Sequence, residues 1–239
     1  AAIAVDGTLL PALTHLRDTI ARRAGELEDV VKTGRTHLMD AMPLTMAQEL
    51  GAWVSQLSQA IERIESAMTR LQRLAQGGTA VGTGINAPAA FGTMMAEHLS
   101  EQTGLDFLPN DSFFASLASQ DAAVELSGQL RGLACVVMKI ANDLRWMNSG
   151  PLAGLGEIEL EALQPGSSIM PGKVNPTQAE ALTQVAAHVM GNDAAIKFAG
   201  SQGHFELNVY NPMMSYNLLQ SIQLLGDAAD SFTERMLLG

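Results

Sequence analysis

The chain has 239 residues, of which 47% are hydrophobic, and its 14 basic and 25 acidic side chains give a formal charge of −11. This composition is typical of a globular protein with enough apolar material for a sizeable core, in one large domain or two small ones. The acidic balance, with a pI near 4.8, argues against a nucleic-acid partner, because no cluster of Lys and Arg is available to neutralise phosphates. No apolar run reaches the ~18 residues that a membrane span needs, so we expect no membrane partner.

The chain carries a single cysteine, Cys135, which cannot form an intrachain disulfide. This favours a reducing compartment, and we therefore expect a cytoplasmic protein. Because Cys135 falls inside an apolar helical run, its side chain is expected to be buried.

Apolar residues recur at helical spacing along almost the whole chain. In chain order, long helices are predicted around the apolar series at residues 9–31, 50–71, 126–147, 182–196 and 218–236, with a shorter helix near 88–102. No stretch alternates with period two between hairpin turns, so a major sheet is not expected. The prediction is an all-α bundle of about five long antiparallel helices. Apolar residues outside a single stripe further suggest that the bundle oligomerises.

Glycine and proline interrupt the helical pattern at residues 33–43, 77–88, 150–176 and 200–212. The third connection is long for a compact helical protein, and loops of this length are more often functional than idle. The polar cluster at residues 79–86 could equally be a plain turn.

The third connection ends in Gly-Ser-Ser-Ile-Met-Pro-Gly-Lys-Val-Asn-Pro at residues 166–176. Glycine and proline at this density break a helix, so backbone amides are available to a ligand, and Lys173 adds a positive charge. Asn175 is a good N-cap and Pro176 suits the first helical position, which places the loop over the positive end of the next helix. The motif therefore predicts a loop that binds a carboxylate or a phosphate.

A second polar cluster, Thr-Gly-Arg-Thr-His-Leu-Met-Asp at residues 33–40, opens the second long helix. His37 is the natural candidate for general acid–base chemistry, since histidine titrates closest to neutrality. Taken alone it is more simply explained as a capping or surface histidine, and its context favours catalysis. The histidines at positions 15, 98 and 188 lie within helical runs and are expected to be structural or surface residues. Since no His, Asp or Glu pair has the spacing of a metal site and no nucleotide-binding loop follows a strand, neither a metal nor a cofactor is expected.

Thr36-His37, the loop at 166–176 and the stretch Ala-Gly-Ser-Gln-Gly-His-Phe-Glu-Leu-Asn at 199–208 together resemble the fumarase/aspartase superfamily. The resemblance spans essentially the whole chain and is closest to the class II, iron-independent fumarate hydratases. Aspartase-like members typically place Ala before the loop lysine and Val-Ile-Pro after Asn-Pro, whereas this chain has Gly172 and Thr177-Gln178 at those places. The implied activity is the cofactor-free hydration of fumarate to malate. An aspartate ammonia-lyase and a catalytically silent helical assembly core are the alternatives.

By that resemblance, Ser167 is expected to be the base that removes the proton next to one malate carboxylate. A serine hydroxyl is too weak a base unaided, so its alkoxide must be stabilised by neighbouring amides and an ammonium group. The aci-carboxylate that forms is expected to be held by Lys173 and Asn175, with Ser168 and Val174 beside them.

The resemblance also implies that Thr36 binds the other carboxylate and that His37 protonates the departing hydroxyl. Glu180 matches the acidic partner that orients this histidine. From the residues alone, Glu180 is instead a first-turn carboxylate that complements the helix dipole. The resemblance further implies a homotetramer in which each site is assembled from three subunits, with a small dicarboxylate as substrate.

The superfamily's N-terminal domain, which ends in Ser-Ser-Asn, and its small C-terminal domain have no counterpart in this sequence. Residues 1–239 are therefore expected to be the central helical domain alone. Three further features depart from the family pattern: Leu152-Ala153 stands where Arg-Cys is frequent, the segment ending at Pro88 lacks a histidine that often follows its asparagine, and His204 replaces an asparagine.

Overall fold

The structure, a computed structural model, describes residues 1–238. Two compact units are distinguished. Unit 1 comprises Ala1–Leu9, Glu62–Gly132 and His188–Leu224, and unit 2 comprises Leu10–Ile61, Leu133–Ala187 and the segment from Leu225 onward.

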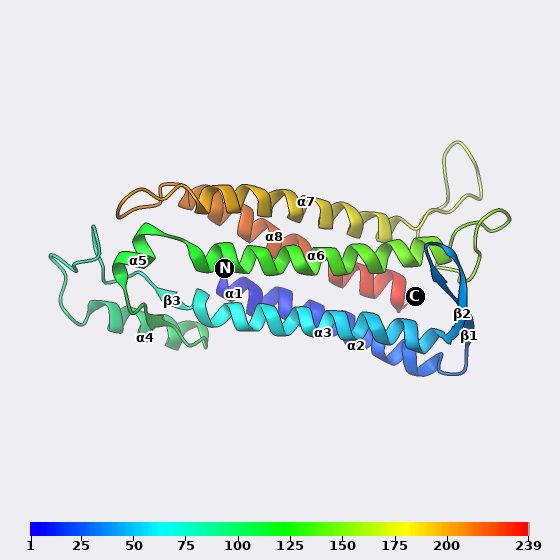
Figure 1. Cartoon of the computed structure of the whole chain (residues 1–239), viewed down its shortest axis with the longest axis horizontal. Helices are drawn as coiled ribbons and strands as arrows, with labels where there is room; N and C mark the ends of the chain where they lie inside the picture. The colour runs from blue at the N-terminus through cyan, green and yellow to red at the C-terminus, as the bar shows by residue number, and fades with distance from the viewer. Residues whose placement is uncertain (239) are drawn as a thin grey trace. The chain divides into compact units, whose positions relative to one another are not determined.

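Five helices are long, as predicted: α2 (Leu10–Glu26), α3 (Met46–Leu71), α6 (Asp121–Met147), α7 (Thr177–Gly200) and α8 (Asn211–Phe232) (Figure 1). They confirm the all-α bundle. The shorter helices are α1 (Ala2–Ala4), α4 (Phe91–Thr103), α5 (Phe113–Ala118) and two π-helical turns, η1 (Val5–Leu9) and η2 (Thr233–Leu237). The helix α4 corresponds to the short helix predicted near residues 88–102, and α5 was not predicted. Among the described residues, no helix is both long and apolar enough to cross a membrane.

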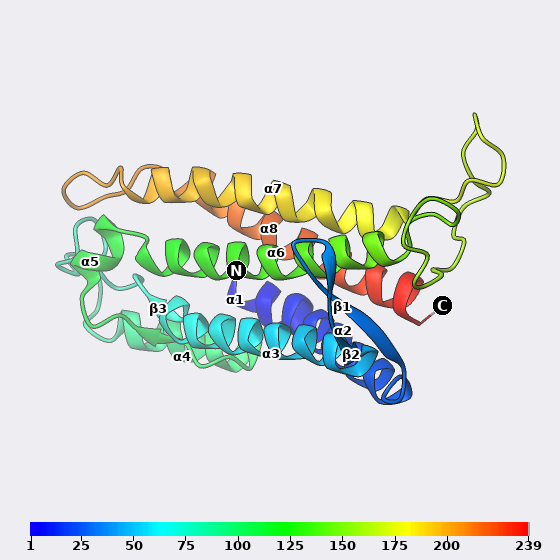
Figure 2. The ribbon, with the colours of Figure 1, turned by 45° about the vertical axis from the view of Figure 1, so that its right-hand side comes forward.

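The core of unit 2 is formed by parts of α2, α3, α6, α7 and α8 that run alongside one another (Figure 2). Apolar residues three and four apart lie on one face of a helix, so each helix contributes a continuous seam. The residues of this core that are at most 1% exposed include Leu13, Leu16, Ile20, Trp53, Leu57, Val137, Ile140, Leu182, Leu225 and Phe232.

Unit 1 has its own apolar core and one buried charge. The core includes Val5, Leu9, Ile64, Leu126, Leu130, Val189, Ile196 and Ile222. Asp193 on α7 is 1% exposed; it accepts a hydrogen bond from the Ser127 hydroxyl at 2.8 Å and lies 3.3 Å from Arg131 and 3.5 Å from Lys197. Two short strands, β3 (Arg73–Leu74) and β4 (Leu108–Pro109), pair in parallel in this unit.

The connection at residues 33–43 was expected to be a loop and is instead most of a β-hairpin. Its strands, β1 (Val31–Thr36) and β2 (Met39–Thr45), are antiparallel, and the helix before them ends at Glu26 rather than near Val31. The sequence gives no period-two signal here because the hairpin does not bury one face: Val31, Met39 and Met42 are all exposed.

Cys135 is exposed on α6, so the expectation of a buried thiol was wrong. The apolar seam of α6 runs through Leu133, Val137 and Ile140, which are all buried. Cys135 lies two residues from both Leu133 and Val137, which on a helix of 3.6 residues per turn places it on a different face.

Candidate active site

The turn of the β1–β2 hairpin carries Thr36 and His37. Thr36 pairs with Met39 across the hairpin, and His37 and Leu38 form the two-residue turn, with φ angles of 55° and 60°. Residues other than glycine rarely adopt a positive φ angle, and for a leucine this backbone conformation is strained. Both His37 and Thr36 are exposed, so the turn presents them on the surface of the chain.

The loop at residues 166–176 folds back on itself through backbone hydrogen bonds. The Ser167 N–H donates to the Lys173 carbonyl at 2.9 Å, and the Lys173 N–H donates to the Met170 carbonyl at 3.1 Å. Gly166 and Gly172 have φ of 98° and 86°, a region that only glycine adopts readily. The two glycines thus permit the close turn that the sequence motif requires.

This fold of the loop supplies amide donors to the predicted base. The Ser167 Oγ accepts from the N–H groups of Ile169 at 3.3 Å and Met170 at 3.4 Å. Both bonds are long. Both come from backbone amides, and not from the ammonium of Lys173 that was expected to act on the same oxygen. Two N–H dipoles aimed at one hydroxyl oxygen stabilise negative charge there, which lowers the cost of forming an alkoxide.

A cavity of about 370 Å³ lies in unit 2 where the loop meets helices α6 and α7. Four predicted site residues line it: Lys173, Val174, Asn175 and Glu180. The rest of the lining consists of Asn142, Arg145, Trp146, Asn148, Ser149, Gly150 and Pro176. The predicted residues Thr36, His37, Ser167 and Ser168 do not line this cavity.

Arg145, in the last turn of α6, is the charged lining residue that the sequence analysis missed. One guanidinium nitrogen, Nη1, donates to the Asn142 side-chain oxygen at 3.2 Å, and Nη2 lies 3.9 Å from the Glu180 carboxylate. A basic residue in a last turn is ordinarily explained by the helix dipole, so its position gives no signal of a site. Together with Lys173, Arg145 makes the cavity suited to an anion.

Glu180 was expected to orient His37, but in this chain its ion-pair partner is Arg145. Within residues 1–238, no hydrogen bond or ion pair joins His37 to Ser167 or to Glu180. The helix boundary also differs slightly from expectation: α7 begins at Thr177, and the Pro176 carbonyl accepts the first helical hydrogen bond from the Glu180 N–H at 3.1 Å. One chain therefore presents the loop half and the histidine half of the predicted site separately.

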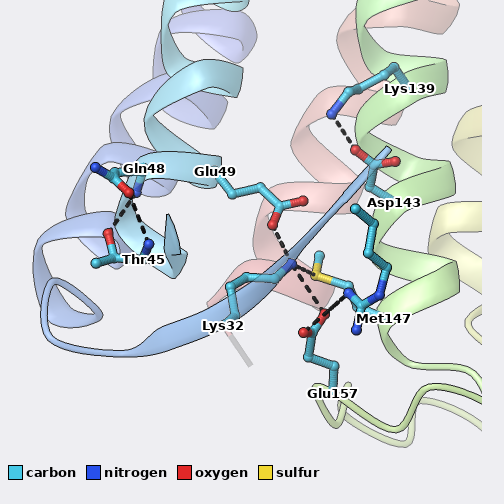
Figure 3. A network of polar contacts seen from close by, with 9 residues as sticks. Lys32, Thr45, Gln48, Glu49, Lys139, Asp143, Met147 and Glu157 are labelled. Carbon is cyan, nitrogen blue, oxygen red and sulfur yellow. Dashed lines mark hydrogen bonds and ion pairs between the residues drawn. The ribbon is translucent and has the colours of Figure 1, made fainter. Parts of the chain in front are cut away.

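A cluster of charged side chains lies along β1, and Figure 3 shows Lys32 between Glu49 and Glu157. Lys32 contacts Glu49, lies 3.1 Å from Glu157 and is also 3.4 Å from the Met147 sulfur. Arg35 donates to both oxygens of Glu157, at 3.2 and 3.0 Å. We call Lys32, Arg35, Glu49 and Glu157 the hairpin ion cluster.

The hairpin ion cluster shifts the protonation of its members. Burial raises the pKa of Glu157, but hydrogen bonds from Arg35 and Lys32, with their positive charges, outweigh burial and lower that pKa below its ordinary value. The hydrogen bond to Glu157 likewise raises the pKa of Arg35, against the effect of burial. Both groups are therefore charged near neutral pH.

The remaining polar segments belong to unit 1. Residues 79–86 form a turn with positive φ at Thr79, Gly82, Gly84 and Asn86. The stretch at 199–208 is closed by Asn208, whose buried side chain donates to the Ala199 carbonyl at 3.0 Å. Over residues 1–238, no group of three His, Cys, Asp or Glu side chains is placed to hold a metal ion.

The chain is thus a helical protein in which the loop at residues 166–176 borders a polar cavity at the N-terminus of α7. The chain belongs to the Lyase family, whose model matches residues 1–191.

The similar proteins include fumarate hydratases. The chain is 60% identical over 237 residues to fumarate hydratase class II 2 of Pseudomonas aeruginosa. This match covers 99% of this chain and 52% of that protein. It is 56% identical over 237 residues to fumarate hydratase class II of Thermosynechococcus vestitus, covering 99% of this chain and 51% of that protein. The chain thus spans about half the length of the curated relatives it matches.

Solved structures give the same picture of the fold. The class II fumarase from Schistosoma mansoni superposes with a TM-score of 0.97 at 40% identity, over 99% of this chain and 52% of that one. A fumarate lyase:delta crystallin from Brucella melitensis bound to cobalt superposes with a TM-score of 0.91 at 41% identity, over 97% of this chain and 50% of the other.

Proposed function

We propose that the protein is a fumarate hydratase that interconverts fumarate and L-malate. The observation that carries the proposal is the loop at residues 166–176, in which two backbone amides point at the Ser167 hydroxyl. The 60% identity to a fumarate hydratase over nearly the whole chain supports it.

In the proposed reaction, the Ser167 alkoxide removes the proton from the carbon next to one malate carboxylate. The electron pair moves onto that carboxylate, giving an aci-carboxylate with extra negative charge on its oxygens. Lys173 and Asn175 hold this charge, with Ser168 and Val174 beside them. The cavity that Lys173, Val174 and Asn175 share supports this assignment.

The second half of the reaction expels the hydroxyl. The aci-carboxylate re-forms the carboxylate and the double bond as the carbon–oxygen bond breaks, and His37 gives the departing hydroxyl a proton so that water leaves. Thr36 binds the other carboxylate, and Glu180 orients His37. Because His37 and Glu180 are not in contact within one chain, this pairing requires a second subunit.

We therefore propose a homotetramer whose active sites combine residues from different subunits, and a central helical domain within a longer protein. Relatives about twice as long as this chain support the proposal of a longer protein.

A cytoplasmic location is also proposed, in keeping with the single cysteine. Analytical ultracentrifugation tests the tetramer directly: a monomeric species at micromolar concentration would contradict it.

The test of function follows fumarate by its ultraviolet absorbance after malate or aspartate is added in parallel cuvettes. Fumarate from malate alone supports the hydratase, whereas fumarate from aspartate would make the protein an ammonia-lyase. If the 239-residue chain produces fumarate from neither, the same assay on the complete protein decides: silence there too would indicate a catalytically silent helical core.

A further inference from the structure

The hairpin ion cluster holds the segment that carries Thr36 and His37. The side chains of Lys32, Glu157, Glu49 and Arg35 are only 6%, 16%, 21% and 22% exposed. Ion pairs shielded to this degree are screened less by salt than surface pairs, and losing one partner leaves a charge uncompensated. The cluster is therefore more than a set of surface contacts.

The hairpin has little else to fix it. A two-stranded hairpin alone is at best marginally stable in water, and hairpins normally gain stability from an apolar face packed on a core. Here the large apolar side chains Val31, Leu38, Met39 and Met42 are exposed. Leu44 of β2 is only partly buried, so the ion pairs of Lys32 and Arg35 are a principal attachment of β1 to the rest of the chain.

The backbone of Glu157 is itself held by the end of α6. Its backbone N–H donates to the Met147 carbonyl at 2.8 Å, and Met147 ends α6 and is itself buried. The Met147 sulfur also contacts the Lys32 ammonium. The end of a long helix therefore holds the carboxylate that receives both cations of β1.

Lys32 and Arg35 reach Glu157 from the same strand, although residues three apart lie on opposite faces of a flat strand. The pairing of β1 with β2 is irregular between Thr33 and Arg35. Such irregularities increase the local twist of a hairpin, which lets both side chains converge on one carboxylate.

We propose that Glu157 is a positioning residue: through Arg35 and Lys32 it sets where the hairpin delivers Thr36 and His37 to the reaction. Arg35 directly precedes Thr36 in the chain, so a change at Arg35 moves both. This inference rests on the proposed function, because it assumes that Thr36 and His37 act on the substrate.

The test compares Glu157→Gln, Arg35→Gln and the double variant in the complete protein, with malate as substrate. Misplacing a reacting group by about 1 Å can cost a hundredfold in rate, so we expect each single variant to lower kcat/KM by about tenfold to a hundredfold, with effects on both kcat and KM. Since Arg35 acts through its contact with Glu157, the double variant should be no worse than Glu157→Gln alone. Glu157→Asp, which keeps the carboxylate, should recover part of the loss.

Glu125→Gln is the matched control. Glu125 receives two hydrogen bonds from Arg70 in unit 1, at 2.6 and 2.7 Å, so the substitution breaks an arginine–carboxylate pair that includes no residue of the hairpin. Its kcat and KM should equal those of the wild type. All rates are compared at a temperature at which circular dichroism shows every variant fully folded, so that lost stability does not enter them.

Two results would overturn the inference while leaving the proposed function in place: wild-type kinetics in Glu157→Gln, or effects of the two single variants that simply add in the double variant. A wild-type protein that forms no fumarate from malate would instead overturn the proposed function, and the inference with it.

Discussion

Replacing Ser167 by alanine tests the centre of the proposed chemistry. The substitution removes one oxygen, the Oγ that accepts the amides of Ile169 and Met170. The loop's backbone bond from the Ser167 N–H to the Lys173 carbonyl does not involve that oxygen and should persist. The variant therefore removes the proposed base and leaves the loop scaffold in place.

The structure sets different magnitudes for activity and for stability. A positioned acid or base typically contributes 10²- to 10⁴-fold, so we expect kcat to fall by about that factor. The two hydrogen bonds that are lost are long, and Ile169 and Met170 are exposed, so water can replace the oxygen. The cost in unfolding free energy should stay below about 1 kcal/mol, which corresponds to less than about 4 °C in Tm.

The assay is the absorbance of fumarate formed from malate, alongside thermal unfolding followed by circular dichroism. Ser112→Ala is the control, since the Ser112 Oγ likewise accepts a backbone amide, from Ala115 at 3.3 Å in unit 1. Ser112→Ala should unfold with about the same free energy as Ser167→Ala and should have the kcat of the wild type. A Ser167→Ala protein that retains more than about a tenth of wild-type kcat would refute Ser167 as the base.

Three further predictions concern charges. Lys173→Met should weaken inhibition by succinate, a non-reacting dicarboxylate, by about tenfold to a hundredfold, because one charge-assisted hydrogen bond is lost. Asp193→Ala should lower the unfolding free energy by about 1–3 kcal/mol in urea titrations, since the Ser127 hydroxyl loses its acceptor while the half-exposed Arg131 and Lys197 can turn to water. The lowered pKa of Glu157 means that its stabilisation is present at neutral pH and lost as the pH falls through its folded-state pKa. The difference in unfolding free energy between wild type and Glu157→Gln should therefore shrink on acidification from pH 7.

Each of these has a contrary outcome. An unchanged inhibition constant for succinate would remove Lys173 from carboxylate binding. An Asp193→Ala protein as stable as the wild type would mean that the buried carboxylate costs as much in desolvation as its partners return. A stability difference for Glu157→Gln that stays constant from pH 7 to pH 3 would contradict a lowered pKa in the folded state.

The helical framework could be predicted from the sequence because its cause is local. On α6, Leu126, Leu130, Leu133, Val137 and Ile140 recur at helical spacing, and all five are buried as that spacing predicts. The hairpin could not be predicted in this way. Its residues do not alternate in polarity, none of them is fully buried, and its attachment depends on Glu157, more than 100 residues further along the chain.

Part of the candidate site could likewise be predicted from the sequence, and part could not. Its residue types are read from the sequence: the loop's glycines are needed for its positive φ angles, and Lys173, Val174, Asn175 and Glu180 fall in one short segment at the start of a helix, where they share one cavity. Arg145 joined that cavity only through the folded structure, since nothing in a last-turn arginine distinguishes dipole compensation from a binding role.

The sequence by itself thus determined the long helices and the glycine-containing loop with its lysine, because each depends on residues close together in the chain, whereas Ser167 was assigned as the base only through the family resemblance. Only the tertiary structure decided that two amides support Ser167, that Glu180 pairs with Arg145 rather than His37 within one chain, and that a nearly buried ion cluster anchors the histidine hairpin. These depend on which distant side chains meet, and hydrogen bonds and ion pairs form only at distances of a few ångströms, which spacing along the chain does not encode.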